Sequence, residues 1–208
     1  MKRCFIFSAG TFFGLRERPE AGDLVIAADA GYLHCKQAKL VPDLLVGDFD
    51  SMDPPRDFPH ITHFPVEKDD TDTMLAVRTA IERGCREVHL YGATGGKRMD
   101  HTLANLQTLQ WIRHQGARGY LYDNDFVFTA IQNETLSIPQ TVDWGLVSVF
   151  CLGATARGID EVGLQYPLSD AMLSSDQPLA VSNHLTGAPA SITVRDGTLV
   201  VGWELPHL

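Results

Sequence analysis

The sequence predicts an α/β N-terminal domain with a mainly parallel sheet, followed by an all-β, sandwich-like C-terminal domain. Up to about residue 125, short apolar runs alternate with segments of helical periodicity, a pattern typical of a parallel sheet covered by helices. Beyond that point the apolar runs are short and alternating, and helical periodicity is nearly absent, which favours a β sandwich. Since 44% of the 208 residues are hydrophobic, both parts can bury a core. We therefore expect domains over residues 1–125 and 126–208.

The elements of the first domain are expected to alternate between strand and helix. The second helix illustrates the criterion, because Met74, Val77 and Ile81 share one face and Gly84 ends the pattern. In chain order the expected elements are strands at 4–8 and 24–28, a helix at 29–39, strands at 44–47 and 61–66, a helix at 71–83, a strand at 88–91, a helix at 100–115 and a strand at 119–122.

The second domain is expected to consist of short strands. They are predicted at 126–131, 135–138, 146–151, 179–182, 190–195 and 199–204. Asp196-Gly197 separates the last two, and an Asp-Gly pair between two strands is typical of a tight β-hairpin.

Composition excludes several classes of protein. The formal net charge of −9 argues against nucleic acid as a partner, because a phosphate backbone requires a basic surface. The longest apolar runs are too short to cross a membrane. None of the four cysteines lies in a C-x-x-C pair, so we expect reduced thiols and a cytoplasmic protein. His60 and His63 have H-x-x-H spacing, but further zinc-type ligands are lacking nearby, and a zinc site is not favoured.

Acidic residues follow the expected strands of the first domain at the point where each strand ends. They are Asp29, Asp48, Asp50, Asp69, Asp70, Asp72 and Asp100. In an open parallel sheet, ligands bind outside the carboxyl ends of the strands. Helix capping alone would explain Asp29, Asp70 or Asp100. It does not explain the pair in Gly47-Asp48-Phe49-Asp50-Ser51, because Pro54 and Pro55 follow too soon for a helix. Two such carboxylates are tolerated when a cation lies between them, and oxygen ligands suit Mg²⁺.

A glycine-rich segment, Gly92-Ala93-Thr94-Gly95-Gly96-Lys97-Arg98, lies between an expected strand and an expected helix. Glycines allow a phosphate to approach the backbone closely, and the start of a helix attracts anions. Arg98 could bind phosphate oxygens with two hydrogen bonds. An ordinary turn is the alternative interpretation. The segment is not a Walker A loop, because Tyr91 stands in place of the first glycine and Arg98 in place of Ser or Thr.

At these residues the sequence resembles the thiamine pyrophosphokinase family. Four blocks match in order, namely Ala28-Asp29-Ala30-Gly31, Pro42-Asp43-Leu44-Leu45-Val46-Gly47-Asp48-Phe49-Asp50-Ser51, Lys68-Asp69-Asp70-Thr71-Asp72 and Gly95-Gly96-Lys97-Arg98-Met99-Asp100-His101. In the second domain, Gly163–Leu168 resembles the family's G-L-x-Y-P-L element, and Ser182-Asn183 resembles its S-N element. The sequence departs from the family at Ala30, where a glycine is usual, and at His184, where Glu is common. Trp203 lies close to the position of a tryptophan that stacks on thiamine in some members.

The resemblance implies a reaction in which thiamine and ATP give thiamine diphosphate and AMP. It implies that Asp48, Asp50 and Asp72 hold Mg²⁺ and act in catalysis with Arg98 and Asp100. The residues implied around ATP are Asp29, Lys68, Asp69, Thr71, Thr94, Gly95, Gly96 and Arg98. Those implied around thiamine are Asp100, His101, Asn105, Ser182 and Asn183. It also implies an ATP- and Mg²⁺-binding catalytic first domain, a thiamine-binding second domain, and a homodimer with active sites at the subunit interface.

Two other functions are compatible with parts of the sequence. A D-x-D phosphatase would use Asp48 as a nucleophile, but its pattern requires Thr or Val at the position of Met52. The D-x-D of such enzymes also normally lies near the N-terminus rather than on a third strand. A non-catalytic nucleotide or vitamin sensor would share the fold, although the complete set of Asp48, Asp50, Asp72 and Arg98 argues against a degenerate site.

Overall fold

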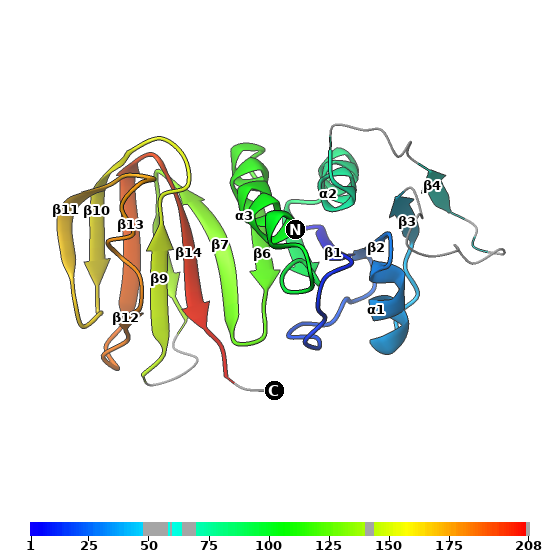
Figure 1. Ribbon diagram of the computed structural model, residues 1–208, viewed down its shortest axis with the longest axis horizontal. Helices are drawn as coiled ribbons and strands as arrows, with labels where there is room; N and C mark the ends of the chain where they lie inside the picture. The colour runs from blue at the N-terminus through cyan, green and yellow to red at the C-terminus, as the bar shows by residue number, and fades with distance from the viewer. Residues whose placement is uncertain (48–57, 59, 64–69, 140–143, 207–208) are drawn as a thin grey trace. The chain divides into compact units, whose positions relative to one another are not determined.

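The computed structural model describes residues 1–47, 58, 60–63, 70–139 and 144–206 (Figure 1). The chain divides into two compact units. The first comprises residues 1–108 and 115–124, and the second comprises residues 109–114 and 125–208. Helix α3, Met99–His114, contributes its N-terminal part to the first unit and its C-terminal part to the second.

The first unit is built on a parallel sheet, as the sequence predicts. Its strand order is β6-β5-β1-β2-β3-β4, and every neighbouring pair is parallel. The strands are β1 (Arg3–Phe7), β2 (Leu24–Ala28), β3 (Leu44–Gly47), β4 (Ile61–His63), β5 (Glu87–Tyr91) and β6 (Arg118–Tyr122). Because the chain passes from β1 outward to β4 and then returns to place β5 on the other side of β1, the strand order reverses between β1 and β5. Such a reversal is where open α/β sheets bind ligands.

Helices cover both faces of this sheet. Helix α1 (Gly31–Gln37) contacts β1 and β2, and α2 (Asp72–Glu82) contacts β1, β2 and β3. Figure 1 shows the two helices on opposite sides of the strands. One face carries a row of stacked rings: Phe7 stacks on Tyr91 and Tyr91 stacks on Tyr122. Strands β1, β2 and β3 are almost entirely buried between these layers, which explains why they form continuous apolar runs in the sequence.

The second unit contains two antiparallel sheets with strand orders β12-β9-β14-β7 and β11-β10-β13-β8. The first sheet comprises β7 (Phe126–Gln132), β9 (Leu146–Phe150), β12 (Asn183–His184) and β14 (Thr198–Glu204). The second comprises β8 (Thr135–Ile138), β10 (Ala156–Val162), β11 (Leu168–Leu173) and β13 (Ala190–Asp196). Contact between β7 and β13 joins the two sheets. The predicted all-β, sandwich-like fold is thus confirmed.

Two predictions about the second unit are wrong. No strand forms over 179–182; the short strand β12 begins at Asn183 instead. The predicted hairpin at Asp196-Gly197 is also absent, because β13 pairs with β8 and β10 whereas β14 pairs with β7 and β9. Asp196-Gly197 still connects β13 to β14, but each of these strands pairs with two other strands. Gly197, with a φ of 116°, therefore carries the chain from one sheet to the other.

Strands β10 and β11 were not predicted, and their sequences explain why. Strand β10 contains two shifts in its pairing with β11, between Arg157 and Ile159 and between Ile159 and Glu161. Such bulges break the alternation on which strand prediction depends. Strand β11 is mostly exposed, so it lacks an apolar face until Leu173.

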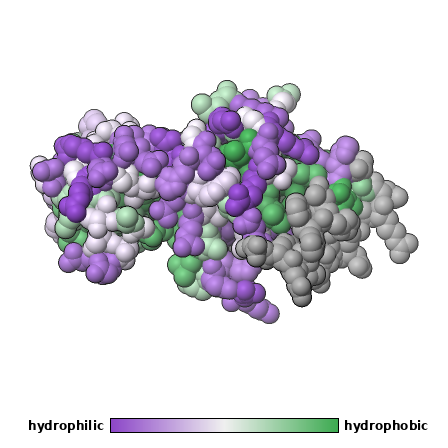
Figure 2. Space-filling view, turned by 90° about the horizontal axis from the view of Figure 1, so that it is seen from above, coloured by the Kyte–Doolittle hydropathy of each residue, from purple (hydrophilic) through white to green (hydrophobic). Residues whose placement is uncertain are grey.

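Much of the visible surface is hydrophilic, as Figure 2 shows. Within the part of the chain that the structure describes, every helix is too short or too polar to cross a lipid bilayer. The cysteines Cys4, Cys35, Cys85 and Cys151 are all buried and unpaired.

Candidate active site

A cavity of about 360 Å³ lies in the first unit at the carboxyl edge of the parallel sheet. It is lined by the segments that follow β1, β2 and β5 and by the first turns of α2 and α3. It therefore lies at the reversal of strand order between β1 and β5. The predicted site residues that line it are Asp29, Asp72, Thr94, Gly95, Gly96, Arg98, His101 and Asn105.

The wall of the cavity between β1 and β5 is formed by two backbone segments. The N–H of Gly10 donates to the carbonyl of Gly92 (2.7 Å), and the N–H of Thr11 donates to that of Thr94 (2.8 Å). His34 Nε2 donates to the Gly10 carbonyl at 2.9 Å. Burial lowers the pKa of His34, so this donor stays neutral and the bond persists at physiological pH. The pairing of β1 with β5 thus continues beyond both strands into the cavity.

The glycine-rich segment is held in one conformation from several sides. Asn105 Nδ2 donates to the Ala93 carbonyl (2.7 Å), and Thr94 Oγ1 donates to Asp123 Oδ1 (2.5 Å). Gly95 has a φ of 66°, and a Cβ there would lie 2.6 Å from Thr11 Oγ1. A side chain at this position would therefore be strained and would collide with the neighbouring segment. The loop is preorganised before any ligand binds.

The departure from the family at Ala30 has a simple structural explanation. Ala30 has a φ of −59°, an ordinary right-handed conformation in which glycine has no advantage. The glycine that the fold does require is Gly31, since a Cβ there would lie only 1.8 Å from the carbonyl oxygen of Phe7. Next to it, Asp29 is 8% exposed and lines the cavity. Its N–H donates to the Val46 carbonyl at 2.8 Å, which extends the pairing of β2 with β3.

The acidic residues before α2 have different surroundings. Asp70 Oδ2 accepts a hydrogen bond from Arg78 Nε at 2.7 Å, whereas Asp72 is the first residue of α2 and lines the cavity. Thr71, predicted to contact ATP, is the N-cap of α2: its Oγ1 accepts from the N–H of Met74 at 3.2 Å. The positive end of the helix dipole therefore lies at the cavity, where it favours bound anions.

Arg98 and Asp100 form a two-point ion pair at the other end of the glycine-rich segment. Arg98 Nε lies 2.9 Å from Asp100 Oδ1, and Arg98 Nη2 lies 2.6 Å from Asp100 Oδ2. The hydrogen bonds from Arg98 lower the pKa of Asp100 to about 2. Both side chains are exposed, at 67% and 64%. Asp100 is therefore a carboxylate at any physiological pH, and Arg98 remains accessible to a ligand.

Some predicted site residues lie elsewhere. Asp48, Asp50, Lys68 and Asp69 fall outside the described residues. Ser182 and Asn183 belong to the second unit, where Asn183 lines a separate cavity of about 200 Å³. Ser182 has a φ of 60°, and its N–H donates to Ser148 Oγ at 3.0 Å.

Sequence reasoning missed several residues that line the main cavity. Ser8 and Gly10 follow β1, and Thr73 Oγ1 donates to Ser8 Oγ at 2.8 Å. A signal was present, because the small residues of Ser8-Ala9-Gly10 follow an apolar strand at the same sheet edge as the acidic residues. These residues carry no charge, so they do not indicate a metal or phosphate site in the way that the aspartates do.

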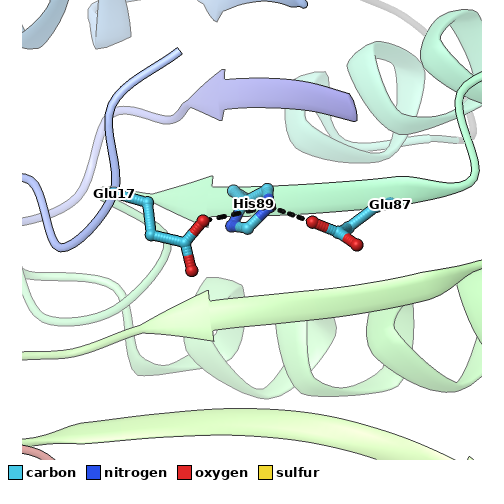
Figure 3. A group of neighbouring side chains, drawn as sticks. All are labelled: Glu17, Glu87 and His89. Carbon is cyan, nitrogen blue, oxygen red and sulfur yellow. Dashed lines mark hydrogen bonds and ion pairs between the residues drawn. The ribbon is translucent and has the colours of Figure 1, made fainter. Parts of the chain in front are cut away.

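A second polar cluster lies away from the cavity. Figure 3 shows the carboxylates of Glu17 and Glu87 on either side of the His89 ring. One ligand atom from each lies within 4.8 Å of the others, a spacing that could hold a metal ion. The described contacts point to a structural network instead. His89 stacks on Phe5 at 4.6 Å between ring centroids, and Arg3 lies 3.6 Å from Glu17, so Arg3 already supplies a positive charge.

Comparison with known proteins agrees with this architecture. Residues 16–121 match the family described as thiamin pyrophosphokinase, catalytic domain, and residues 133–199 match thiamin pyrophosphokinase, vitamin B1 binding domain. A thiamine pyrophosphokinase of Bacillus subtilis (strain 168) is 25% identical over 184 residues, which are 86% of each chain.

Solved structures of similar proteins cover almost the whole chain. The crystal structure of thiamine pyrophosphokinase from Bacillus subtilis superimposes with a TM-score of 0.84 at 23% identity, covering 98% of this chain and 99% of that one. A thiamin pyrophosphokinase family protein from Enterococcus faecalis superimposes with a TM-score of 0.82 at 26% identity, covering 99% and 100%. Because both domain models match in order and together span most of the sequence, the chain belongs to the thiamin pyrophosphokinase family.

Proposed function

We propose that this enzyme transfers the diphosphoryl group of ATP to the hydroxyl group of thiamine at the carboxyl edge of the parallel sheet, giving thiamine diphosphate and AMP. The observation that carries the proposal is the cavity between β1 and β5. It combines the carboxylates of Asp29 and Asp72, a preorganised glycine-rich loop and an accessible arginine, and most of its lining residues lie within the region that matches the catalytic domain model. Transfer of phosphate groups depends mainly on positioning and on neutralising charge, and this arrangement provides both.

We propose Mg²⁺ as the metal, held by Asp48, Asp50 and Asp72. The fit is supported by Asp29 and Asp72, which bring carboxylate oxygens into the same cavity as the glycine-rich loop. Oxygen ligands beside a phosphate site suit Mg²⁺, which binds proteins through a few carboxylates and through substrate phosphates. When bound, the ion would neutralise charge on the phosphates and on the departing AMP. Lys68, Asp69, Thr71, Thr94, Gly95 and Gly96 are proposed to surround ATP.

Arg98 and Asp100 are proposed to act together. A guanidinium group has five N–H donors, so Arg98 can hold Asp100 and a terminal phosphate at once. A carboxylate with a pKa of about 2 is a weak base at neutral pH. This supports orientation of the thiamine hydroxyl by Asp100 rather than removal of its proton. His101 and Asn105 lie one turn apart on α3 and both line the cavity, and they are proposed to complete this side of the thiamine site.

The second unit is proposed to bind thiamine, with Ser182 and Asn183 near the ligand, and to contribute to a homodimer whose active sites lie between subunits. Support comes from exposed apolar side chains beside its cavity, since Tyr166 and Leu179 are 64% and 57% exposed. Apolar groups of this kind are typical of surfaces that are covered in an assembly. Light scattering at assay concentration tests the dimer proposal; an active monomer would exclude it.

The buried, unpaired cysteines support a cytoplasmic location.

One experiment tests the reaction itself. The protein is incubated with thiamine, Mg²⁺ and ATP labelled at the β-phosphorus, and the products are identified by mass. We expect the label in thiamine diphosphate together with an equal amount of unlabelled AMP. Accumulation of thiamine monophosphate with ADP would show stepwise transfer of the γ-phosphate and contradict the proposal. The phosphatase and sensor alternatives are not retained, because both domains match a kinase family.

A further inference from the structure

A buried carboxylate in the second unit is only half satisfied. Glu161 on β10 is 1% exposed, and its Oε2 accepts a hydrogen bond from Asn183 Nδ2 at 2.9 Å. Its Oε1 is buried too, and no described residue donates a hydrogen bond to it. Burial raises the pKa of Glu161 above its usual value. Buried polar atoms are almost always paired, so one without a partner calls for an explanation.

An irregularity in the backbone of β10, rather than simple strand alternation, places the Glu161 carboxylate in the interior. Counting every second residue inward from buried Ala156 would bring Asp160 to the interior. A bulge at Gly158, which has a φ of 63°, shifts the pattern so that Ile159 and Glu161 point inward instead. Bulges commonly re-aim a side chain at functional sites.

The neighbouring amide cannot rotate to satisfy the second oxygen. Asn183 Oδ1 accepts from the N–H groups of Tyr166 and His184, both at 3.0 Å. Asn183 Nδ2 donates to the Tyr166 carbonyl at 2.8 Å and to Glu161. All of its hydrogen-bonding capacity is therefore used. The partner of Glu161 Oε1 has to come from outside the described side chains.

The cavity of about 200 Å³ beside Glu161 shows what kind of partner fits. Its walls include Tyr166, Leu168, Leu179 and Val181, which are largely apolar. A pocket for a drug-sized ligand measures roughly 300–1,000 Å³, so this one suits a single ring. Apolar walls around one carboxylate match a flat heteroaromatic ring that carries an N–H donor.

We propose that Glu161 determines the specificity of the acceptor site: its free Oε1 accepts a hydrogen bond from the exocyclic amino group on the pyrimidine ring of thiamine. This inference rests on the proposed function, which supplies an aminopyrimidine as substrate. The amino group is the donor of thiamine that takes no part in the transfer, so the hydroxyl group remains free to react. Every residue named here lies within the region that matches the vitamin B1 binding domain.

The test compares thiamine with an analogue in which a carbonyl replaces the exocyclic amine, with AMP formation as the readout. Glu161→Gln is expected to raise the KM for thiamine about tenfold or more, with little change in kcat, because a hydrogen bond to a charged acceptor is lost. The glutamine amide can donate to the carbonyl of the analogue, so the preference for thiamine should fall by at least about tenfold. Glu161→Leu should lose the preference for thiamine over the analogue, and its activity with the analogue should not increase.

Asp170→Asn is the matched control. Asp170 lies on β11 of the same sheet, its side chain is 84% exposed, and it contacts Arg195 at 3.3 Å away from the cavity. It has a φ of 48°, which asparagine also tolerates. This variant should keep the KM and the preference of the unmodified enzyme. If Glu161→Leu does not fold, Glu161→Gln still decides the question.

Three outcomes would overturn the proposal. An unchanged preference in Glu161→Gln would show that Glu161 does not read the ligand. Equal weakening for thiamine and for the analogue would show that the carboxylate responds to the positive charge of the thiazolium ring instead. A loss of stability with an unchanged preference would indicate a purely structural role. Absence of AMP from the unmodified enzyme would contradict the proposed function, and calorimetric titration of both proteins with thiamine would then test Glu161 by itself.

Discussion

The two cavities of this enzyme are built from different parts of the polypeptide. The cavity of the first unit is shaped by backbone: Gly10 and Gly92 are joined by a main-chain hydrogen bond, and Gly95 occupies a place where no Cβ fits. The cavity of the second unit is shaped by side chains, with a single buried carboxylate among apolar walls. A backbone site constrains which residue types can occupy many positions, whereas a side-chain site depends on very few. The first therefore leaves a clear sequence motif, and the second does not.

Their charged groups respond to their surroundings in opposite ways. Asp100 is exposed and bound by Arg98, which lowers its pKa to about 2. Glu161 is buried, and the loss of water raises its pKa. The ion pair with Arg98 stabilises the negative charge of Asp100, whereas burial destabilises the negative charge of Glu161 until a donor binds.

The largest expected effect tests the metal site of the first unit. If Asp72 holds Mg²⁺ as proposed, Asp72→Asn should lower turnover by at least about 10²-fold, because a charged metal ligand is lost where charge neutralisation drives the reaction. Unfolding free energy should change by less than about 0.5 kcal/mol, as for other partly exposed substitutions. Turnover assays and urea denaturation measure the two quantities, and Asp48→Asn and EDTA should reproduce the loss of turnover.

Asp70→Asn provides the control for this prediction. Asp70 precedes Asp72 by two residues but is engaged by Arg78 at 2.7 Å, so its removal should leave turnover nearly unchanged. If the two variants lose activity equally, or if Asp72→Asn keeps normal activity at low Mg²⁺, the assignment of Asp72 to the metal is wrong.

The next effect tests whether the first cavity depends on its backbone. Gly95→Ala and Gly116→Ala both place a side chain on a left-handed backbone, with φ values of 66° and 72°, which costs about 1–2 kcal/mol of stability. Only at Gly95 would the new Cβ meet a neighbour, Thr11 Oγ1, whereas nothing lies within 4 Å at Gly116. We expect the KM for ATP to rise about tenfold in Gly95→Ala alone, since the preorganised loop is displaced. Similar KM values in both variants would show that the loop does not bind the nucleotide.

Sequence reasoning predicted the first unit well because its local and tertiary signals agree. The strands Leu24–Ala28 and Leu44–Gly47 were predicted with their observed bounds, since fully buried parallel strands are unbroken apolar runs. The helix expected over 71–83 forms as Asp72–Glu82, with the Thr71 cap and Gly84 marking its limits. The lining residues Asp29, Asp72 and Gly95 were predicted because carboxylates and a glycine-rich segment follow several strands at one edge of the sheet.

The second unit was harder to predict because its pattern depends on long-range pairing. The bulge at Gly158 disguised β10, and the turn at Asp196-Gly197 gave no information about which strands would pair. Glu161 was missed for the same reason: in sequence it lies between Asp160 and Val162 in what resembles a polar surface segment. Only the fold shows that it is buried and lacks a donor.

A smaller effect follows from the burial of Glu161. Its pKa is raised in the folded protein, so the stability present below the unfolded pKa of roughly 4.3 is lost as pH rises through the folded pKa. Glu161→Gln has no such charge and should be more stable than the unmodified protein at pH 7.5 by about 1 kcal/mol. Urea denaturation between pH 5 and pH 7.5 should show this difference narrowing as pH falls. A difference that is constant with pH, or a destabilised variant at pH 7.5, would mean that the carboxylate is well accommodated without a ligand.

The smallest effect concerns the third charged group, Glu17 with Glu87 and His89. The side chain of Glu17 is 48% exposed, and its Oε2 lies 3.6 Å from Arg3 Nη1. Exposed ion pairs of this kind contribute about 0–1 kcal/mol, so Glu17→Gln should change stability by no more than about 0.5 kcal/mol and leave turnover unchanged. The positive charge of Arg3 also opposes a cation at this place. Addition of Zn²⁺ or EDTA should therefore leave the thermal unfolding midpoint unchanged, both in the unmodified protein and in Glu17→Gln. A saturable rise of the midpoint with Zn²⁺ that disappears in Glu17→Gln would instead identify a metal site at a cluster that does not line the main cavity.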